Sequence, residues 1–147
     1  MFTRALVGIA DGKRFDYTYL HSDGYPEWTG RILRQQHNNP TAAALLVAHG
    51  DISGLGVFAG VVDRCSDSEP AGNADLTELH DCARQMWAEW IYLWRDGAWH
   101  AAADQNNAER RIDYTATDGL YTPLRLLPDA PLPPEATPRE MFHPQFQ

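Results

Sequence analysis

The sequence predicts an α+β fold, in which a small antiparallel sheet built from two β-hairpins packs against about three helices in a single domain. Two segments, 3–21 and 90–100, each carry an Asp-Gly turn between apolar or alternating stretches, which is typical of a hairpin. Three segments, 26–38, 40–50 and 76–87, carry helix start signals and apolar residues that suit a helix.

The first hairpin is expected to pair residues 3–10 with residues 14–21 across a turn at Asp11 and Gly12. Because a strand repeats every two residues, four side chains fall on one face of the second strand: Phe15, Tyr17, Tyr19 and His21. His21 therefore ends an aromatic stripe, and we expect it to be at least partly buried.

Two short helices are expected to follow the first hairpin. Pro26 suits the first position of a helix because its missing N–H would have no helical partner there, and this helix should end near His37. Asn39 can cap a second helix, and Gly50 can end it in a left-handed conformation. Gly30, inside the first helix, indicates close packing of the backbone.

Glycine and polar residues mark the next connections. Residues 51–56 are expected to form a glycine-rich connection, residues 57–62 a strand, and residues 63–74 a loop. Residues 111–116 are a further candidate strand.

The third helix carries the clearest helical signal. Asp75 and Glu78 match a capping box, which places the helix at residues 76–87. Apolar residues then recur at helical spacing: Leu76, Leu79, Ala83, Met86 and Trp87. We expect this set to face the core.

The second hairpin brings two tryptophans together. A two-residue turn at Asp96 and Gly97 pairs Trp94 with Trp99, and such an aromatic pair anchors one face of a sheet. With five Trp residues in one small chain, most should be core and only one or two exposed. The candidates for an interface are Trp28, Trp94 and Trp99.

Length and proline content divide the chain into two parts. Its 147 residues suit a single domain, which we place at residues 1–122. Seven of the ten prolines lie at or after Pro123, so residues 123–147 are expected to form an extended arm.

Charge and cysteine content narrow the function classes. Twenty acidic and twelve basic residues give a formal charge of −8, and Lys13 is the only lysine, which disfavours nucleic-acid binding. The acidity could attract a basic partner or serve solubility alone. Cys65 and Cys82 match no metal or disulfide pattern, and no apolar stretch is long enough to cross a bilayer, so we expect a cytoplasmic protein. No cofactor or bound metal is expected.

Two similar triplets, His21-Ser22-Asp23 and His49-Gly50-Asp51, are the most suggestive chemical feature. If the fold brings them together, two imidazoles and two carboxylates could bind a divalent metal or act as acid and base. In the alternative reading, which we favour, the aspartates bond backbone amides at turns and the histidines pack at the ends of elements. No catalytic residue is therefore assigned.

One stretch resembles a family of small proteins encoded by phages, prophages and plasmids. The resemblance rests on a Tyr-x-His-x-Asp-Gly-Tyr-Pro segment, a later Gly-Asp-Ile-Ser-x-Leu segment and a Trp-containing hairpin, and it covers about the first 100 residues. The matching residues of the first segment are Tyr19, His21, Asp23, Gly24, Tyr25 and Pro26. Ser22, where the family often has an aromatic residue, and the proline-rich arm depart from the pattern.

The resemblance implies an origin in a mobile element, and three hypotheses follow. The first is a non-enzymatic protein that binds and inhibits or modulates a host protein complex, such as a CRISPR-Cas defence system. The second is a small metal-dependent or acid-base enzyme that uses His21, Asp23, His49 and Asp51. The third is a structural or assembly protein of a phage.

Overall fold

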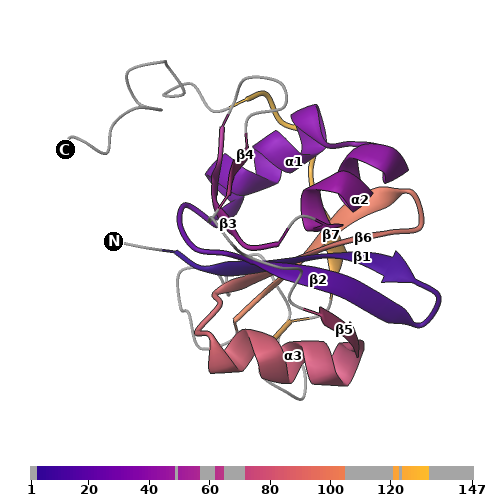
Figure 1. Cartoon of the computed structure of the whole chain (residues 1–147). Helices are drawn as coiled ribbons and strands as arrows, with labels where there is room; N and C mark the ends of the chain where they lie inside the picture. Colours follow the sequence, from indigo (N-terminus) through magenta and orange to yellow (C-terminus); the bar gives the residue numbers. More distant parts are fainter. Residues whose placement is uncertain are drawn as a thin grey trace.

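The computed structural model describes most of the chain as one mixed β-sheet with helices on both faces (Figure 1). The described residues are 3–48, 50–56, 62–64, 72–104, 121–122 and 124–132, with backbone alone for residues 62–64. The α+β class is confirmed, while the expectation of a purely antiparallel sheet is wrong.

The two expected hairpins are present, and a parallel strand pair joins them. The first consists of β1 (Ala5–Asp11) and β2 (Arg14–Leu20), and the second of β6 (Trp90–Arg95) and β7 (Ala98–Ala103). β1 and β6 run side by side in parallel. Both strands begin at the same end of the sheet, where the Glu89 N–H donates to the Arg4 carbonyl at 2.8 Å. The sheet is therefore mixed.

The turn of the first hairpin lies one residue later than expected. Asp11 pairs with Arg14, so the two turn residues are Gly12 and Lys13, and Gly12 has a φ of +67°. In the second hairpin the turn is at Asp96 and Gly97, as expected, with φ angles of +52° and +78°. Both residues are left-handed, as the right-handed twist of a tight hairpin requires.

Four short strands complete the sheet. They are β3 (Ile52–Leu55), β4 (Val62–Arg64), β5 (Gly72–Asp75) and β8 (Arg125–Leu126). The order along the sheet is β4-β3-β2-β1-β6-β7-β8. β3 pairs with β2 at Leu20, and β5 pairs with residues 14–17 of β2.

Two of these strands correct the expected connections. Residues 51–56 contain β3, and the expected loop at 63–74 contains most of β5 and the end of β4. Their glycine and polar content gives little strand propensity, and pairing along the outer edge of β2 supplies the extended structure instead. Of the expected strand at 57–62, residues 57–61 lie outside the described residues.

The helices begin where their caps predict. The segment from Pro26 starts with a π-helical turn, η1 (Pro26–Gly30), and continues as α1 (Arg31–Gln36). α2 (Pro40–Ala48) is capped by Asn39, whose Oδ1 accepts from the Ala42 N–H at 2.8 Å. α3 (Leu76–Gln85) carries the expected capping box but ends two residues early. None of the helices in the described part of the chain is both long and apolar enough to span a bilayer.

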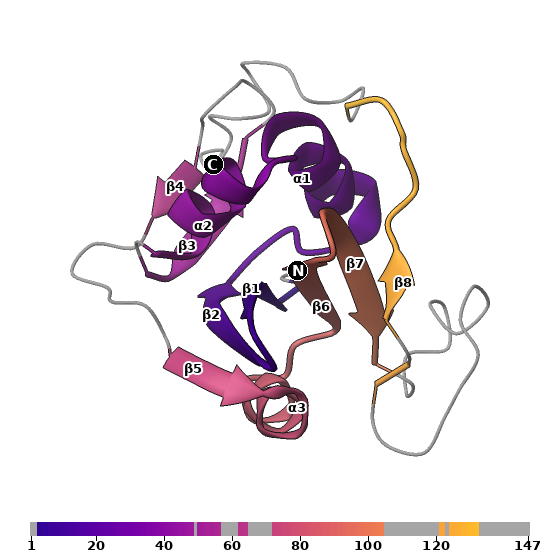
Figure 2. The same ribbon diagram turned by 90° about the vertical axis from the view of Figure 1, so that its right-hand side faces the viewer.

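The sheet is buried on both faces. η1, α1 and α2 cover one face and α3 covers the other (Figures 1 and 2). Side chains of β6 alternate between the two cores: Trp90, Tyr92 and Trp94 face α1 and α2, and Ile91 and Leu93 face α3. Trp94 pairs with Trp99 as expected, edge to face, with ring centroids 5.6 Å apart.

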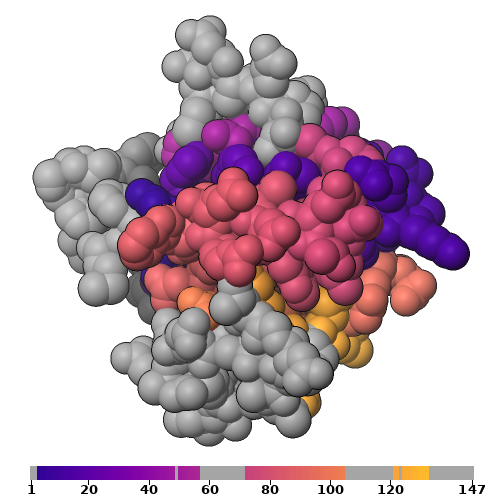
Figure 3. Space-filling view, turned by 90° about the horizontal axis from the view of Figure 1, so that it is seen from below, coloured from indigo at the N-terminus to yellow at the C-terminus, as the bar shows by residue number. Residues whose placement is uncertain are grey.

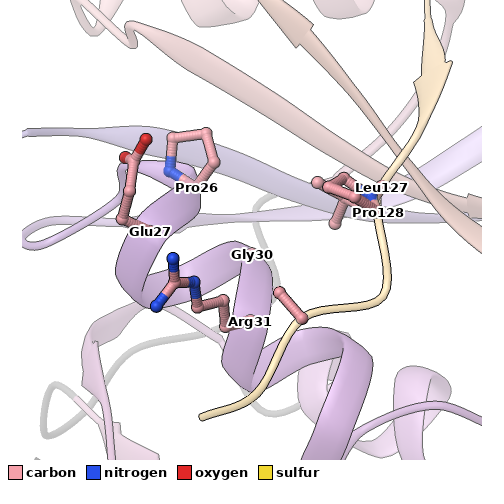
Figure 4. Close-up of a pocket in the computed structure, with 7 residues that line it drawn as sticks. Pro26, Glu27, Gly30, Arg31, Leu127 and Pro128 are labelled. Atoms are coloured by element: carbon pink, nitrogen blue, oxygen red, sulfur yellow. The ribbon is translucent and has the colours of Figure 1, made fainter. Parts of the chain in front are cut away.

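The first part of the expected arm packs against the body. After β8, Leu127 is buried in the core, and the Gln35 side-chain amide donates to the Ala130 carbonyl at 2.8 Å. A small cavity of about 130 Å³ separates this segment from η1 and α1, between Pro26 and Pro128 (Figure 4). Residues 133–147 and the candidate strand at 111–116 lie outside the described residues.

Candidate functional site

The two sequence segments that carry the histidine triplets meet where β2 ends and β3 begins. Leu20 pairs with Ile52 in parallel, and the His21 N–H donates to the Ile52 carbonyl at 2.9 Å. The Ser22 hydroxyl donates to the Ser53 carbonyl at 2.6 Å. Segments about 30 residues apart in sequence thus form one junction, which the sequence alone could not establish.

His21 and Asp51 are in side-chain contact at this junction, and the contact is an ion pair when the imidazole is protonated. The His21 Nε2 lies 3.3 Å from the Asp51 Oδ2, and the two side chains are 43% and 29% exposed. The Thr18 hydroxyl donates to the other carboxylate oxygen at 3.4 Å. The pair is therefore held from two sides and still open to solvent. His49 lies outside the described residues.

The turn after His21 is held by backbone interactions. Asp23 has a φ of +56°, and its carbonyl accepts from the Thr29 hydroxyl at 2.6 Å. The Gly24 N–H donates to the Thr3 carbonyl at 2.9 Å, and the Gly24 carbonyl accepts from the buried Tyr92 hydroxyl at 2.6 Å. A Cβ at Gly24 would lie 2.8 Å from the Thr3 carbonyl oxygen, so only glycine fits.

Asp23 and Tyr25 are part of this framework, and the carbonyl of each accepts a hydrogen bond within it. The Tyr25 carbonyl accepts from the Thr29 N–H at 2.9 Å, at the start of η1. Neighbouring protein atoms desolvate the Asp23 carboxyl and raise its pKa, although the residue as a whole is exposed.

Tyr19 feels the charge of Asp51 and packs beside a second polar cluster under α3. The Tyr17 hydroxyl lies 3.3 Å from the Cys82 sulfur, and the rings of Tyr17 and Tyr19 meet edge to face with centroids 5.8 Å apart. Burial raises the pKa of both phenols, and the charge of Asp51 adds to the rise in the pKa of Tyr19. Both phenols are therefore neutral at physiological pH.

The chemistry of this junction is that of a histidine beside a carboxylate. Such a pair can orient an imidazole for proton transfer. Within the described ranges, no group of three or more His, Cys, Asp or Glu side chains is placed to hold a metal ion. Of the three expected residues that the structure describes, His21, Asp23 and Asp51, it brings His21 and Asp51 into contact.

The tryptophans proposed for an interface are mostly internal. Trp94 is 6% exposed and Trp99 is fully buried, so the expectation of an interface role is wrong for both. The Trp99 indole donates to the His37 carbonyl at 3.0 Å, and the partly buried Trp28 indole donates to the Leu55 carbonyl at 2.9 Å. The indole N–H groups of Trp28 and Trp99 are thus satisfied inside the fold.

The exposed tryptophan is Trp87, just beyond α3. Its side chain is 80% exposed and its φ is +67°. The face of the molecule that α3 forms is the one shown in Figure 3. The Ala88 N–H donates to the Ala83 carbonyl at 2.9 Å and the Trp87 N–H to the Arg84 carbonyl at 3.0 Å. These two bonds form a Schellman motif, in which Trp87 holds the position that usually requires glycine.

Sequence reasoning placed Trp87 on the buried side of α3, and that expectation is wrong. The helix ends at Gln85, and the left-handed turn rotates the next side chains off the helical spacing, so Trp87 points outward while Leu79 and Ala83 remain buried. Helical spacing alone could not reveal this, because the end of a helix without a glycine has no sharp sequence signal.

Comparison of the chain with protein-family models, with curated proteins and with solved structures finds no match. Its function is inferred from its own side chains.

Proposed function

We propose that the protein is a non-enzymatic binding protein that engages a host protein complex and inhibits or modulates it. The observation that carries the proposal is Trp87, which is 80% exposed in a strained backbone position. The partner surface that suits it is an apolar pocket large enough for an indole ring. The formal charge of −8 adds long-range attraction toward a partner that is basic overall.

The energetics of Trp87 support a role in binding another protein rather than in stabilising the single chain. A left-handed conformation costs a residue with a Cβ about 1–2 kcal/mol. Burial of its indole could offset that cost, since burying a large aromatic side chain contributes about 1.5–3 kcal/mol. Because the Trp87 side chain stays in water, the fold of the single chain gains little from it. Insertion into a partner would recover the burial energy.

The neighbours of Trp87 suit a rim around such an anchor. Arg84 and Gln85 are exposed in the last turn of α3, and Arg4 donates to the Met86 carbonyl at 3.3 Å. Arg84 also pairs with Asp81 at 2.5 Å. Polar side chains that surround a central aromatic residue exclude water from it when a partner docks.

The experiment compares three forms of the full chain in capture from a lysate of the host: the wild type, Trp87→Gly and Leu45→Ala. Leu45 is a matched control because it is an exposed apolar residue, 55% exposed, on the opposite face of the sheet. We expect a partner that the wild type and Leu45→Ala retain and that Trp87→Gly loses. Titration calorimetry with the purified partner should then show at least about a 30-fold loss of affinity, the size of a Trp hot spot.

Two results would count against the proposal. One is the absence of any captured protein that distinguishes the wild type from Trp87→Gly. The other is a captured partner whose affinity for Trp87→Gly equals its affinity for the wild type, which would place the interface elsewhere.

Acid-base catalysis is the second candidate, and the contact between His21 and Asp51 favours it. The pair is partly open to solvent and has a carboxylate in place to orient the imidazole. Its test is the hydrolysis of a p-nitrophenyl ester by the wild type and by His21→Gln. Turnover by the wild type that His21→Gln lacks would favour this candidate. Equal background rates for the two forms would exclude ester hydrolysis as the activity of this pair.

A further inference from the structure

We propose that a cavity between α2 and the first hairpin is a binding site for a small apolar cation, such as an alkylammonium or arylammonium ion. The cavity has a volume of about 500 Å³. Four of its lining side chains are apolar, Ile9, Ala44, Val47 and Ala48, and two are polar, Asp16 and Asn73. The site is independent of Trp87, since α2 and α3 lie on opposite faces of the sheet (Figure 1).

Four elements build the cavity wall. Ile9 on β1 lies opposite Asp16 on β2, and Asp16 lies opposite Asn73 on β5. α2 lies over this part of the sheet and contributes Val47, which is 1% exposed. Figure 2 shows α2 and β5 on the same side of the molecule, on either side of β2. The polar and apolar parts of the wall are therefore fixed by strand register and helix packing.

The apolar part of the cavity wall comes largely from α2, whose composition is unusual for a helix on the surface of a domain. The helix has no charged residue in Pro40–Ala48, and Ala44, Leu45 and Ala48 are exposed. A helix on the surface of a domain ordinarily turns polar side chains to solvent. α2 instead presents apolar side chains both to the core and to the cavity, and such surface is typical of a place where a ligand binds.

The carboxylate of Asp16 selects the charge of the ligand. Its Oδ1 accepts from the Asn73 side-chain amide at 2.8 Å, which orients the group. Within the described residues, Arg14 pairs with Glu78 and bonds Asn73, and no Arg or Lys side chain pairs with Asp16. A carboxylate that makes no ion pair within the described residues, beside apolar walls, favours a ligand that has an apolar body and one positive charge, and it disfavours an anion.

The volume sets the size of the ligand. Sites for small molecules occupy about 300–1,000 Å³, and the cavity falls inside that range. A benzylammonium ion fits with room to spare, so it serves as the probe. A fragment of this size is expected to bind with a Kd on the order of 1–10 mM.

The first test titrates benzylammonium into the full chain while methyl signals of Ile9 and Val47 are followed by NMR. We expect saturable shifts of both methyl groups. Benzyl alcohol, which has the same ring without the charge, should bind about threefold to fivefold more weakly, and benzenesulfonate more weakly still. Absence of saturable shifts at Ile9 and Val47 in the millimolar range, or equal affinity for the cation and the sulfonate, would overturn the proposal.

The second test uses variants of the cavity wall. Asp16→Asn should weaken benzylammonium about threefold to fivefold, whereas Asp11→Asn, which removes an exposed carboxylate from the same hairpin outside the cavity, should leave the affinity unchanged. Ala44→Leu keeps a good helix former and fills the cavity, so it should abolish the shifts while circular dichroism stays that of the wild type. Equal losses in Asp16→Asn and Asp11→Asn, or full binding by Ala44→Leu, would refute the site.

Discussion

Two turns of the molecule place a non-glycine residue in the left-handed region next to a candidate functional group. Asp23 has a φ of +56° beside His21, and Trp87 has a φ of +67° at the end of α3. Around Asp23, hydrogen bonds from Thr29 and Tyr92 hold the turn against the core. At Trp87 the backbone bonds of the Schellman motif are made, but the side chain remains 80% exposed.

Other contacts of the fold offset the backbone strain at Asp23, whereas no such contact offsets the strain at Trp87 within the described residues. The first turn joins β2 to η1 and closes the junction with β3, so its unusual backbone is a means of construction. The second turn would form equally well with glycine, so its tryptophan adds nothing that the helix end needs. Function is therefore better sought at a residue whose backbone strain stabilises nothing else in the fold.

Gly24→Ala should give the largest effect, because it attacks the first turn directly. The new Cβ would meet the Thr3 carbonyl oxygen at 2.8 Å and the Ala5 Cβ at 2.9 Å. We expect a loss of about 3 kcal/mol in the free energy of unfolding, measured by urea denaturation. Gly54→Ala is the matched control in the same junction, since its Cβ would approach only the Ser22 hydroxyl at 3.5 Å. Equal stability of the two variants would contradict the structural role of the turn.

Tyr92→Phe should give the next largest effect on the same turn. It removes the hydroxyl that donates to the Gly24 carbonyl at 2.6 Å and leaves a buried acceptor without that donor. The expected loss is about 2 kcal/mol by urea denaturation, with an unchanged m-value because the same surface is exposed on unfolding. A loss below about 0.5 kcal/mol would mean that the turn does not depend on this bond.

Local signals in the sequence predicted the elements of this framework well. The Asp75 capping box, the Asn39 cap and the Asp96-Gly97 turn each specify a backbone conformation through their own side chains or through glycine. The pairing of Trp94 with Trp99 followed from the turn alone. These features need no information from distant residues.

The features that the sequence did not predict depend on contacts between residues that are distant in sequence. β3 and β5 have weak strand propensity and exist because β2 offers them an edge. The contact between His21 and Asp51 depends on that same pairing, so the sequence identified the two residues but did not predict that they are in contact. The exposure of Trp87 depends on where α3 ends, and spacing along the helix predicted burial instead.

Trp87→Gly, in the second turn, should raise the stability of the protein, whereas the variants of the first turn should lower it. Glycine adopts a positive φ without a Cβ penalty, so we expect a gain of about 1 kcal/mol, seen as a rise of about 3 °C in Tm. Trp87→Ala is the control, because it removes the indole and keeps the penalty, and its Tm should stay close to that of the wild type. A drop in Tm for Trp87→Gly would show that the tryptophan stabilises the isolated fold.

A double-mutant cycle on His21→Gln and Asp51→Asn should give the smallest effect. The two side chains are 43% and 29% exposed, and ion pairs in such positions have coupling energies of about 0.5 kcal/mol. The cycle is measured by urea denaturation. Because the backbone bonds of the junction do not involve these side chains, both single variants should fold and keep the partner that Trp87 binds. A coupling above about 2 kcal/mol would make the pair part of the framework, and loss of the partner in either variant would move the binding surface from the end of α3 to the junction of β2 and β3.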